Sequence, residues 1–349
     1  MGLKLGTRLI QLHKTYSVGR SCLLKTTNML NQKTIVITGA SSGAGKAIAL
    51  EFAQQANKLV LAARNMIALE ETADECRALG AEVKCVQTDV SEPTALINLA
   101  SEADDFGNGI DVWVNNAGIL AVGSFTDTPL EVTEQVIRTN LLGYIYGAHA
   151  VMPYFKKQGR GILINNISIG GFMPVPYGVG YSASKFGIRG FSSALKAELK
   201  DFPDIHVCDA YPAFLDSPGI QHAANYTGKV LKPAPPVYDP RRLAMAIVSL
   251  AENPRSELMV GSISNLIRLA YGILPGITLT ITKAVISTYL KQAKDSGKTN
   301  GNIFNTLAFG NAVFGGWGLP GRPKAHRKYI AAGLLATTAL SLLLVRKTR

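Results

Sequence analysis

A tyrosine and a lysine in this chain have a spacing that suits proton-transfer chemistry. Tyr181 and Lys185 are four residues apart, so on a helix they project from the same face. A free phenol has a pKa of about 10, and a neighbouring ammonium favours its ionised form. With 12 tyrosines in the chain, one such pair arises close to chance, and a surface pair is the plain alternative. Tyr181 becomes a candidate general acid or base only if other polar residues surround it.

Two further polar residues stand where such chemistry needs them. Ser168 lies thirteen residues before Tyr181, at the end of a predicted strand, and its hydroxyl can stabilise negative charge on a substrate oxygen. Asn140 lies inside a long predicted helix, Glu131–Lys156. The combination makes catalysis the favoured interpretation. We therefore predict the catalytic residues to be Asn140, Ser168, Tyr181 and Lys185.

The elements that must position these residues alternate between predicted strands and predicted helices. Short apolar runs typical of buried parallel strands stand at Thr34–Thr38, Leu59–Ala63, Val83–Val86, Val112–Val114, Ile162–Ile167, Ile205–Ala210 and Leu258–Val260. Helical stretches lie between them, among others at Lys46–Gln55, Ala68–Leu79, Glu131–Lys156 and Ser182–Leu199. This order predicts an α/β fold, a Rossmann-like doubly wound parallel sheet of about seven strands with helices on both faces.

A glycine-rich loop, TGASSGAG, separates the first predicted strand from the first helix. Its glycines, Gly39, Gly43 and Gly45, let the backbone turn tightly and approach a pyrophosphate, which the N–H groups at the helix N-terminus attract. Ser41 and Ser42 can add hydroxyl donors. A glycine triplet alone is a weak signal. Between a strand and a helix it favours nucleotide binding over a plain turn.

The glycine spacing, together with three further motifs, resembles the short-chain dehydrogenase/reductase family. Asp89 and Val90 follow the third predicted strand, where the family's aspartate contacts adenine. The NNAG segment at 115–118, which includes Asn116, follows the fourth strand and is similar to the family segment that supports the sheet and lines the cofactor. The resemblance covers residues 34 to about 217.

The third of these motifs follows the sixth strand and departs from the family's Pro-Gly…Thr pattern in two places. Pro212 is kept, but Ala213 replaces the glycine and Ser217 replaces the threonine, with Leu215 between them. Ser217 keeps a hydroxyl, whereas Ala213 makes the backbone less permissive. We expect a modest change in the substrate loop and no loss of activity. The proline-rich loop at 217–239 is the expected lid.

The end of the second predicted strand indicates which cofactor is bound. Family members that bind NAD place an acid there to accept a hydrogen bond from the ribose 2′-OH. This chain has Ala63 and then Arg64, and a guanidinium pairs well with a 2′-phosphate. We therefore predict NADP, although an ordinary surface arginine is the alternative. The predicted cofactor contacts are Gly39, Ser41, Ser42, Gly43, Gly45, Arg64, Asp89, Val90, Asn116, Tyr181, Lys185, Pro212, Leu215 and Ser217.

The resemblance implies an NADP(H)-dependent oxidoreductase that interconverts a secondary alcohol and a ketone or aldehyde. In the reducing direction Tyr181 would donate its proton as a general acid. The resemblance also implies that Lys185 holds the nicotinamide ribose and that Asn140 positions a water linking Lys185 to solvent. The alternatives are a 3-ketoacyl-type reductase and a catalytically silent NADP-binding regulator. Silent members usually lose the tyrosine or the lysine, and this chain keeps both. No metal site is predicted.

The charge distribution argues against a nucleic-acid partner. The formal net charge is +12, but residues 1–33 hold six Lys/Arg, residues 322–349 hold seven, and neither segment has an acid. The 36 basic residues less these 13 leave 23 against 24 acidic residues, so the body is near neutral. The four cysteines show no disulfide or zinc spacing and suit a reducing compartment.

Both ends of the chain extend beyond the predicted catalytic domain, 34–262. Residues 1–33 form a basic extension that is a presequence, a loosely attached helix or a stretch upstream of a true start at Met29, the last slightly favoured. Residues 263–328 form an apolar helical C-terminal extension, expected near the substrate pocket. It consists of the apolar segments 266–274 and 277–290, followed by a Gly/Asn-rich stretch.

The tail at 329–345 is a candidate membrane anchor with basic residues on both flanks. Seventeen helical residues span about 25 Å, slightly short of a hydrocarbon core of about 30 Å, but flanking Lys and Arg side chains can snorkel. We expect membrane association over a soluble tail helix, with a cytoplasmic catalytic domain and a lipophilic substrate. The family resemblance suggests a homo-oligomer.

Overall fold

The computed structural model describes residues 32–318. The segment before residue 32 and the predicted membrane segment 329–345 lie outside the described residues. Within residues 32–318, no helix is long and apolar enough to cross a membrane.

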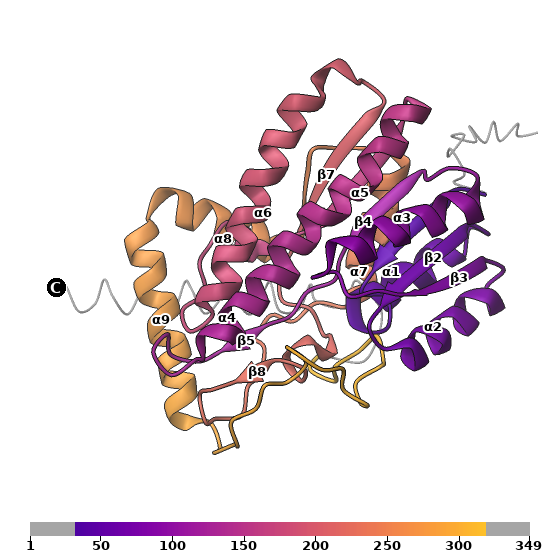
Figure 1. The fold of residues 1–349 in the computed structure, drawn as a ribbon. Coiled ribbons are helices and arrows are strands. Elements are labelled where there is room, and N and C mark those ends of the chain that lie inside the picture. Colours follow the sequence, from indigo (N-terminus) through magenta and orange to yellow (C-terminus); the bar gives the residue numbers. More distant parts are fainter. Residues whose placement is uncertain (1–31, 319–349) are drawn as a thin grey trace, which may run out of the picture.

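A parallel sheet of seven strands forms the centre of the molecule (Figure 1). The strands are β1 (Thr34–Thr38), β2 (Lys58–Ala63), β3 (Glu82–Gln87), β4 (Val112–Asn115), β6 (Gly161–Asn166), β7 (Ile205–Pro212) and β9 (Glu257–Val260). Their order across the sheet is β3-β2-β1-β4-β6-β7-β9, and every neighbouring pair is parallel. The doubly wound, Rossmann-like fold predicted from the alternating pattern is therefore confirmed.

Helices cover both faces of this sheet, which explains why its central strands are apolar throughout. One face carries α1 (Gly43–Ala53), α2 (Met66–Ala78) and α7 (Pro240–Glu252), and the other carries α3 (Pro93–Gly107), α5 (Gly143–Gln158) and α6 (Val179–Glu198). Successive strand residues point to opposite faces. Ile35 and Ile37 accordingly pack into the first layer and Val36 into the second, and all three are fully buried.

The predicted long helix Glu131–Lys156 is wrong as a single helix. The chain forms α4 (Leu130–Ile137), then a π-helical turn, η1 (Arg138–Leu142), and only then α5. A π turn inserts one extra residue into the helical repeat and often marks a functional site. Here the turn contains Asn140, whose side chain is fully buried against a neighbouring loop.

The predicted lid at 217–239 contains regular structure. It begins with a short 3-10 turn, η4 (Pro218–Ile220), and continues into β8 (Ala224–Asn225), which pairs with β5 (Ala121–Val122) in a small parallel sheet. Two other 3-10 turns, η2 (Ile169–Gly171) and η3 (Leu199–Asp201), flank α6 in sequence.

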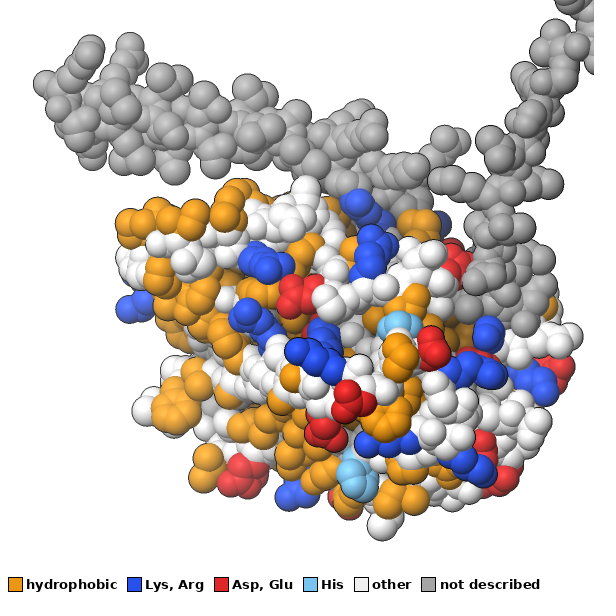
Figure 2. All heavy atoms as spheres, turned by 90° about the horizontal axis from the view of Figure 1, so that it is seen from above, with side chains coloured by type: hydrophobic (Ala, Val, Ile, Leu, Met, Phe, Trp, Pro, Cys, Tyr) orange, Lys and Arg blue, Asp and Glu red, His pale blue; other side chains and the backbone are white. Residues whose placement is uncertain are grey.

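Two helices follow the last strand, α8 (Ser262–Ile273) and α9 (Pro275–Gln292). Pro275 separates them, since proline disfavours a helical conformation at the preceding residue. Their outer side is apolar, and Figure 2 shows hydrophobic side chains gathered on that side of the molecule. The side chains that are more than half exposed there are Leu266, Leu269, Ile273, Leu274, Ile277, Ile281 and Val285. Residues 293–318 then run back along the body without a helix or strand of their own.

Candidate active site

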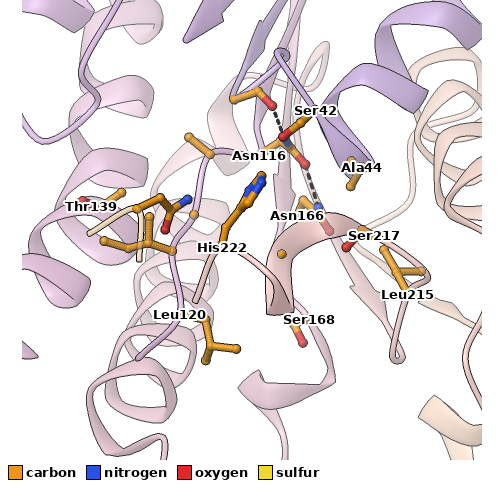
Figure 3. A pocket seen from close by; sticks show the side chains of 18 of the residues that line it. Ser42, Ala44, Asn116, Leu120, Thr139, Asn166, Ser168, Leu215, Ser217 and His222 are labelled. Carbon is orange, nitrogen blue, oxygen red and sulfur yellow. Dashed lines mark hydrogen bonds between the residues drawn. The ribbon is translucent and has the colours of Figure 1, made fainter. Parts of the chain in front are cut away.

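A cavity of about 430 Å³ opens at the carboxyl ends of the strands, where the strand order reverses between β1 and β4. This crevice is where doubly wound sheets bind their ligands. It is lined by every predicted cofactor contact and by Ser168. Figure 3 shows several of these side chains, among them Ser42, Asn116 and Ser168. Asn140 is the one predicted site residue that does not line it. The sequence motifs, which lie far apart in the chain, are thus brought to one place.

Lys185 is held in the interior of the site by α6, with only 5% of its surface exposed. Its Nζ lies 5.6 Å from the ring centroid of Tyr181 and 5.1 Å from that of Tyr144, and it donates a hydrogen bond to the carbonyl of Asn166 at 3.4 Å. Burial lowers the pKa of Lys185 from its ordinary 10.5 to about 7. The lysine is therefore a group that can change charge near neutral pH.

Tyr181 and Ser168 meet at the same end of the cavity. Burial raises the pKa of the Tyr181 phenol, and a hydrogen bond with Ser168 opposes that rise. Ser168 has a φ of +99°, a strained conformation for a side-chain-bearing residue and one that clusters at functional sites. Its Oγ accepts a hydrogen bond from the Gly170 N–H at 3.2 Å. This strained turn presents the hydroxyl toward Tyr181.

Gly170 keeps space open beside the phenol. A Cβ added at this position would lie 3.0 Å from Cε1 of Tyr181 and 3.7 Å from Oγ of Ser168. The ring therefore packs directly against glycine backbone, and a larger residue would have to displace the ring or the serine.

Asn140 supports the site indirectly. Its amide accepts a hydrogen bond from the Ile119 N–H at 2.8 Å and donates to the Ile119 carbonyl at 2.9 Å. It also donates to Oγ of Ser184, next to Lys185 in α6, at 3.3 Å. The structure thus gives Asn140 the role of joining the π turn, the loop after β4 and α6. The predicted water link to Lys185 stays a prediction.

The glycine loop forms a cradle that only glycine permits. Gly39 has a φ of +68°, and a Cβ there would lie 2.7 Å from Cα of Ala117. A Cβ on Gly45 would lie 2.0 Å from the carbonyl oxygen of Gly39, so α1 begins directly against the loop. Ser42 makes no side-chain cap, and the first turn of α1 has no acid. The N–H of Gly43 donates to the carbonyl of Ala312 at 2.9 Å, and the rest of the positive end of this helix is available to a phosphate.

Asn116 fixes the position of this loop across two strand ends. Its main-chain N–H donates to Oγ1 of Thr38 at 2.9 Å, and its Nδ2 donates to the Thr38 carbonyl at 2.9 Å. Its Oδ1 accepts from Nδ2 of Asn166, also at 2.9 Å. The Oδ1 of Asn166 is buried and has no hydrogen-bond partner, so a donor from a bound molecule would complete the network. Cradle and network together fit a dinucleotide.

Arg64 lies where the sequence places it, but its guanidinium has partners that were not predicted. It donates to the carbonyls of Asn302, Ile303 and Phe304 at 2.5, 3.2 and 3.5 Å. Within residues 32–318 it forms no ion pair within 4.0 Å, so its charge stays uncompensated beside the cavity. Asp89 accepts hydrogen bonds from Ser91 at 2.7 and 2.9 Å, which fixes its carboxylate at the cavity wall.

Several lining residues were missed from the sequence. His222 lies in the cavity wall, with its Nε2 3.0 Å from the Phe309 carbonyl, and burial lowers its pKa. Residues far along the chain also line the cavity, namely Asn302, Thr306, Leu307 and Asn311. They belong to the Gly/Asn-rich stretch, which has no periodicity and no motif that could have indicated them.

This fold and site define a nicotinamide-dependent oxidoreductase of the doubly wound class, and the sequence comparisons assign the family. The family model for short chain dehydrogenase matches residues 33–226, and the chain belongs to this family. Its members act on CH–OH groups and bind nicotinamide cofactors.

Individual relatives cover different shares of the chain. An uncharacterized oxidoreductase of Bacillus subtilis (strain 168), YxnA, is 32% identical over 254 residues, or 71% of each chain. The mouse 17-beta-hydroxysteroid dehydrogenase 13 is 34% identical over 167 residues, which are 48% of this chain and 55% of that protein. The solved alcohol dehydrogenase of the archaeon Thermococcus sibiricus, complexed with 5-hydroxy-NADP, is 28% identical. Its TM-score is 0.58, and the match covers 67% of this chain and 98% of that one.

Proposed function

We propose that this protein is an NADP(H)-dependent oxidoreductase that interconverts a secondary alcohol and a ketone or aldehyde on a lipophilic substrate. The observation that carries the proposal is the cavity itself. It joins the glycine cradle at one end to Tyr181, Lys185 and Ser168 at the other. A dinucleotide held at its phosphates by the cradle would extend toward the catalytic side chains.

The residues at the catalytic end provide the proton chemistry. The bound nicotinamide supplies or accepts the hydride. In the reducing direction Tyr181 donates its phenolic proton to the substrate oxygen, and the Ser168 hydroxyl donates a hydrogen bond to the same oxygen. The ammonium of Lys185, 5.6 Å from the Tyr181 ring centroid, then stabilises the phenolate left behind. In the oxidising direction the phenolate takes the proton from the alcohol.

The preference for NADP rests on Arg64. No acid stands at the end of β2 to accept a bond from a free 2′-OH, because Ala63 occupies that position. Main-chain carbonyls are neutral acceptors, so the hydrogen bonds of Arg64 leave its positive charge available to a 2′-phosphate. The Thermococcus sibiricus structure, which is complexed with 5-hydroxy-NADP, agrees with this preference.

The lipophilic substrate is supported by the catalytic end of the cavity, which carries apolar side chains from Ile119, Leu120, Ile169, Met173 and Val175. A polar substrate would leave its own hydrogen-bonding groups unpaired beside them. Helix α9 lies against this end, since Oγ1 of its Thr282 is 3.8 Å from Sδ of Met173.

The apolar outer side of α8 and α9 would serve to dock the protein on an anionic membrane. The two helices contain no acid, and besides Arg268, which pairs with Glu257 at 3.2 Å, they carry Lys283 and Lys291, whose charge complements anionic headgroups. Ile277 and Ile281, one helical turn apart, are 57% and 58% exposed. A substrate dissolved in the bilayer would then approach the catalytic end from the side of α9.

Vesicle flotation tests this docking. A chain that ends at residue 328, and so lacks the predicted anchor at 329–345, should float with vesicles containing phosphatidylglycerol. In that chain Ile277→Glu with Ile281→Glu should weaken partitioning at least about tenfold by removing two apolar contacts. Ile67→Glu, at the 78% exposed Ile67 of α2, is the matched control. Unchanged flotation of the double variant would overturn the docking. A change from dimer to monomer in size measurements would assign the surface to a second copy instead.

Turnover with both cofactors tests the function. Steroid ketones, long-chain alkyl ketones and 3-ketoacyl thioesters should be assayed with NADPH and with NADH. We expect NADPH to be preferred over NADH, and Arg64→Leu to reduce that preference because it removes the guanidinium that would pair with the 2′-phosphate. Any loosening of the chain around Arg64 would weaken both cofactors alike, so the ratio of the two turnover rates isolates the effect of the charge. Binding without turnover of any substrate would favour a silent regulator. Turnover confined to the thioesters would favour a 3-ketoacyl-type reductase.

A further inference from the structure

The stretch that follows α9 crosses the mouth of the cavity. Residues 293–318 are named the C-terminal strap here. In Figure 1 the strap leaves the end of α9, passes β8 and ends near α1. It contains no regular element, so its position is set by the bonds that it makes to the body.

The first part of the strap is fixed on the side of β8. Thr299 exchanges two main-chain hydrogen bonds with Asn225, at 2.8 and 3.0 Å, and Asp295 forms an ion pair with Lys229 at 2.6 Å. Ile303 then inserts a fully buried side chain into the cluster of Ile119, Val132, Val136 and Ala224. A fully buried isoleucine is a firm anchor, because its removal leaves a cavity.

The last part of the strap is fixed on the opposite side of the cleft. The Gly315 N–H donates to the Asp216 carbonyl at 3.2 Å, and the Trp317 N–H donates to Oδ1 of Asp216 at 2.7 Å. Asp216 precedes Ser217 in the segment predicted to contact nicotinamide. The strap is therefore anchored on both sides of the cavity.

Between these anchors the strap contacts the end of β2, the start of α1 and His222, which all line the cavity. Arg64 and Asn65, at the end of β2, donate to strap carbonyls, Asn65 to that of Leu307 at 3.3 Å. The N–H of Gly43, at the start of α1, donates to the Ala312 carbonyl at 2.9 Å. His222 contacts the strap from the third side, at the Phe309 carbonyl.

The strap also presents to the cavity an unpaired hydrogen-bond acceptor and no charged side chain, which suits a bound nucleotide. Asn302 lines it, and its side-chain Oδ1 is buried without a hydrogen-bond partner, whereas its main-chain N–H and carbonyl are already bonded to His222 and Arg64. Residues 299–318 contain no charged side chain, so nothing on this part repels phosphate. A buried acceptor without a donor indicates a missing partner.

We propose that the C-terminal strap is the outer wall of the dinucleotide site. Asn302 accepts a hydrogen bond from an amino or hydroxyl group of the bound nucleotide, and the dinucleotide enters and leaves only when the strap detaches. This rests on the proposed function, because it requires that a nicotinamide dinucleotide occupies the cavity. The consequence is a cofactor that is enclosed and leaves slowly.

Two glycines of the strap provide a matched pair of test variants. Gly310 and Gly316 both have a φ of +77°, so alanine strains the backbone equally at either position. A Cβ on Gly310 would lie 2.2 Å from Nε2 of His222, whereas a Cβ on Gly316 would meet nothing within 4 Å. Because the ring of His222 is buried and its Nε2 is bonded to the Phe309 carbonyl, Gly310→Ala should break this bond and loosen the strap, whereas Gly316→Ala should leave the strap seated.

The rate of NADPH release tests whether the strap encloses the bound dinucleotide or has no effect on its release. Stopped-flow displacement of bound NADPH by excess NADP⁺ should be at least about tenfold faster for Gly310→Ala than for Gly316→Ala, with the wild-type rate close to that of Gly316→Ala. Equal release rates for the two variants would overturn the proposal. Tighter NADPH binding by Gly310→Ala would also overturn it, because the strap would then be blocking the site.

Two further measurements do not depend on that variant. Amide hydrogen exchange in residues 299–318 of the wild-type protein should slow at least about tenfold when NADPH binds, and unchanged exchange would contradict a closing wall. Asn302→Leu should raise the Kd for NADPH about fivefold, and an unchanged Kd would contradict the contact at Asn302. If the wild-type protein binds no nicotinamide dinucleotide at all, the proposed function fails first, and that outcome is distinct from all of these.

Discussion

Replacing the buried lysine by methionine should make the protein inactive but more stable. Lys185 is 5% exposed, and burial lowers its pKa from 10.5 to about 7. That difference corresponds to about 5 kcal/mol of unfolding free energy wherever the folded lysine is charged. Its contacts with the Tyr144 ring and the Asn166 carbonyl offset about 1–2 kcal/mol. We therefore expect Lys185→Met to gain about 3 kcal/mol at pH 6.

The gain should depend on pH in a defined direction. The unfolded lysine keeps its proton up to its ordinary pKa of 10.5, whereas the folded one loses it near 7. Between these values the unfolded state binds more protons, so the stability of the wild-type protein rises with pH. The advantage of Lys185→Met is therefore full below about pH 7, shrinks through pH 9 and disappears above about pH 10.5.

Urea unfolding at pH 6, 7.5 and 9 measures this difference. Lys200→Met, at an exposed lysine just after α6, is the control and should change the unfolding free energy by less than about 0.5 kcal/mol at every pH. A Lys185→Met protein that is less stable than the wild type, or whose gain in unfolding free energy does not change with pH, would refute the reasoning that burial destabilises the charged form of this lysine.

Three further predictions concern the cofactor cradle, the phenol pocket and the lysine charge. Gly45→Ala should abolish NADPH binding in a calorimetric titration, because its Cβ would lie 2.0 Å from the Gly39 carbonyl oxygen. Gly190→Ala is the control and should bind NADPH normally, since its Cβ would meet nothing within 4 Å. Gly170→Val should lower kcat at least about tenfold with the Kd for NADPH unchanged, because it crowds Tyr181 and Ser168, and a wild-type kcat would contradict the packing. Ketone reduction should slow as pH rises through about 7, since the charge of Lys185 is then lost, and a pH–rate profile that is flat from 6 to 8.5 would argue against the role of the ammonium.

The sheet and its motifs could be predicted because their signals are local. Strands such as β1, buried on both faces, must be apolar at every position, and the glycine loop must lie between such a strand and a helix. The turn at Arg138–Leu142 could not be predicted, since a π turn has no local signature. It is stabilised by bonds from Asn140 to Ile119, 21 residues away.

The partners of Arg64 could not be predicted for a similar reason. The position of Arg64 follows from the second strand, but its acceptors lie 238–240 residues further along the chain. They belong to the C-terminal strap, which has no periodic pattern to place it against β2. Long-range contacts made by irregular segments depend on the whole fold, whereas sequence patterns indicate only the structure of residues that are neighbours in the chain.

The central claim is that Tyr181 transfers the proton at the end of a dinucleotide cavity. The most direct test is a single-turnover measurement on Tyr181→Phe, which removes only the phenolic oxygen. Enzyme saturated with NADPH is mixed with a ketone that the wild-type protein reduces. The account predicts that NADPH still binds and that its oxidation, measured at saturating NADPH, slows by about 10²–10⁴-fold. Oxidation of NADPH at the wild-type rate would contradict the claim.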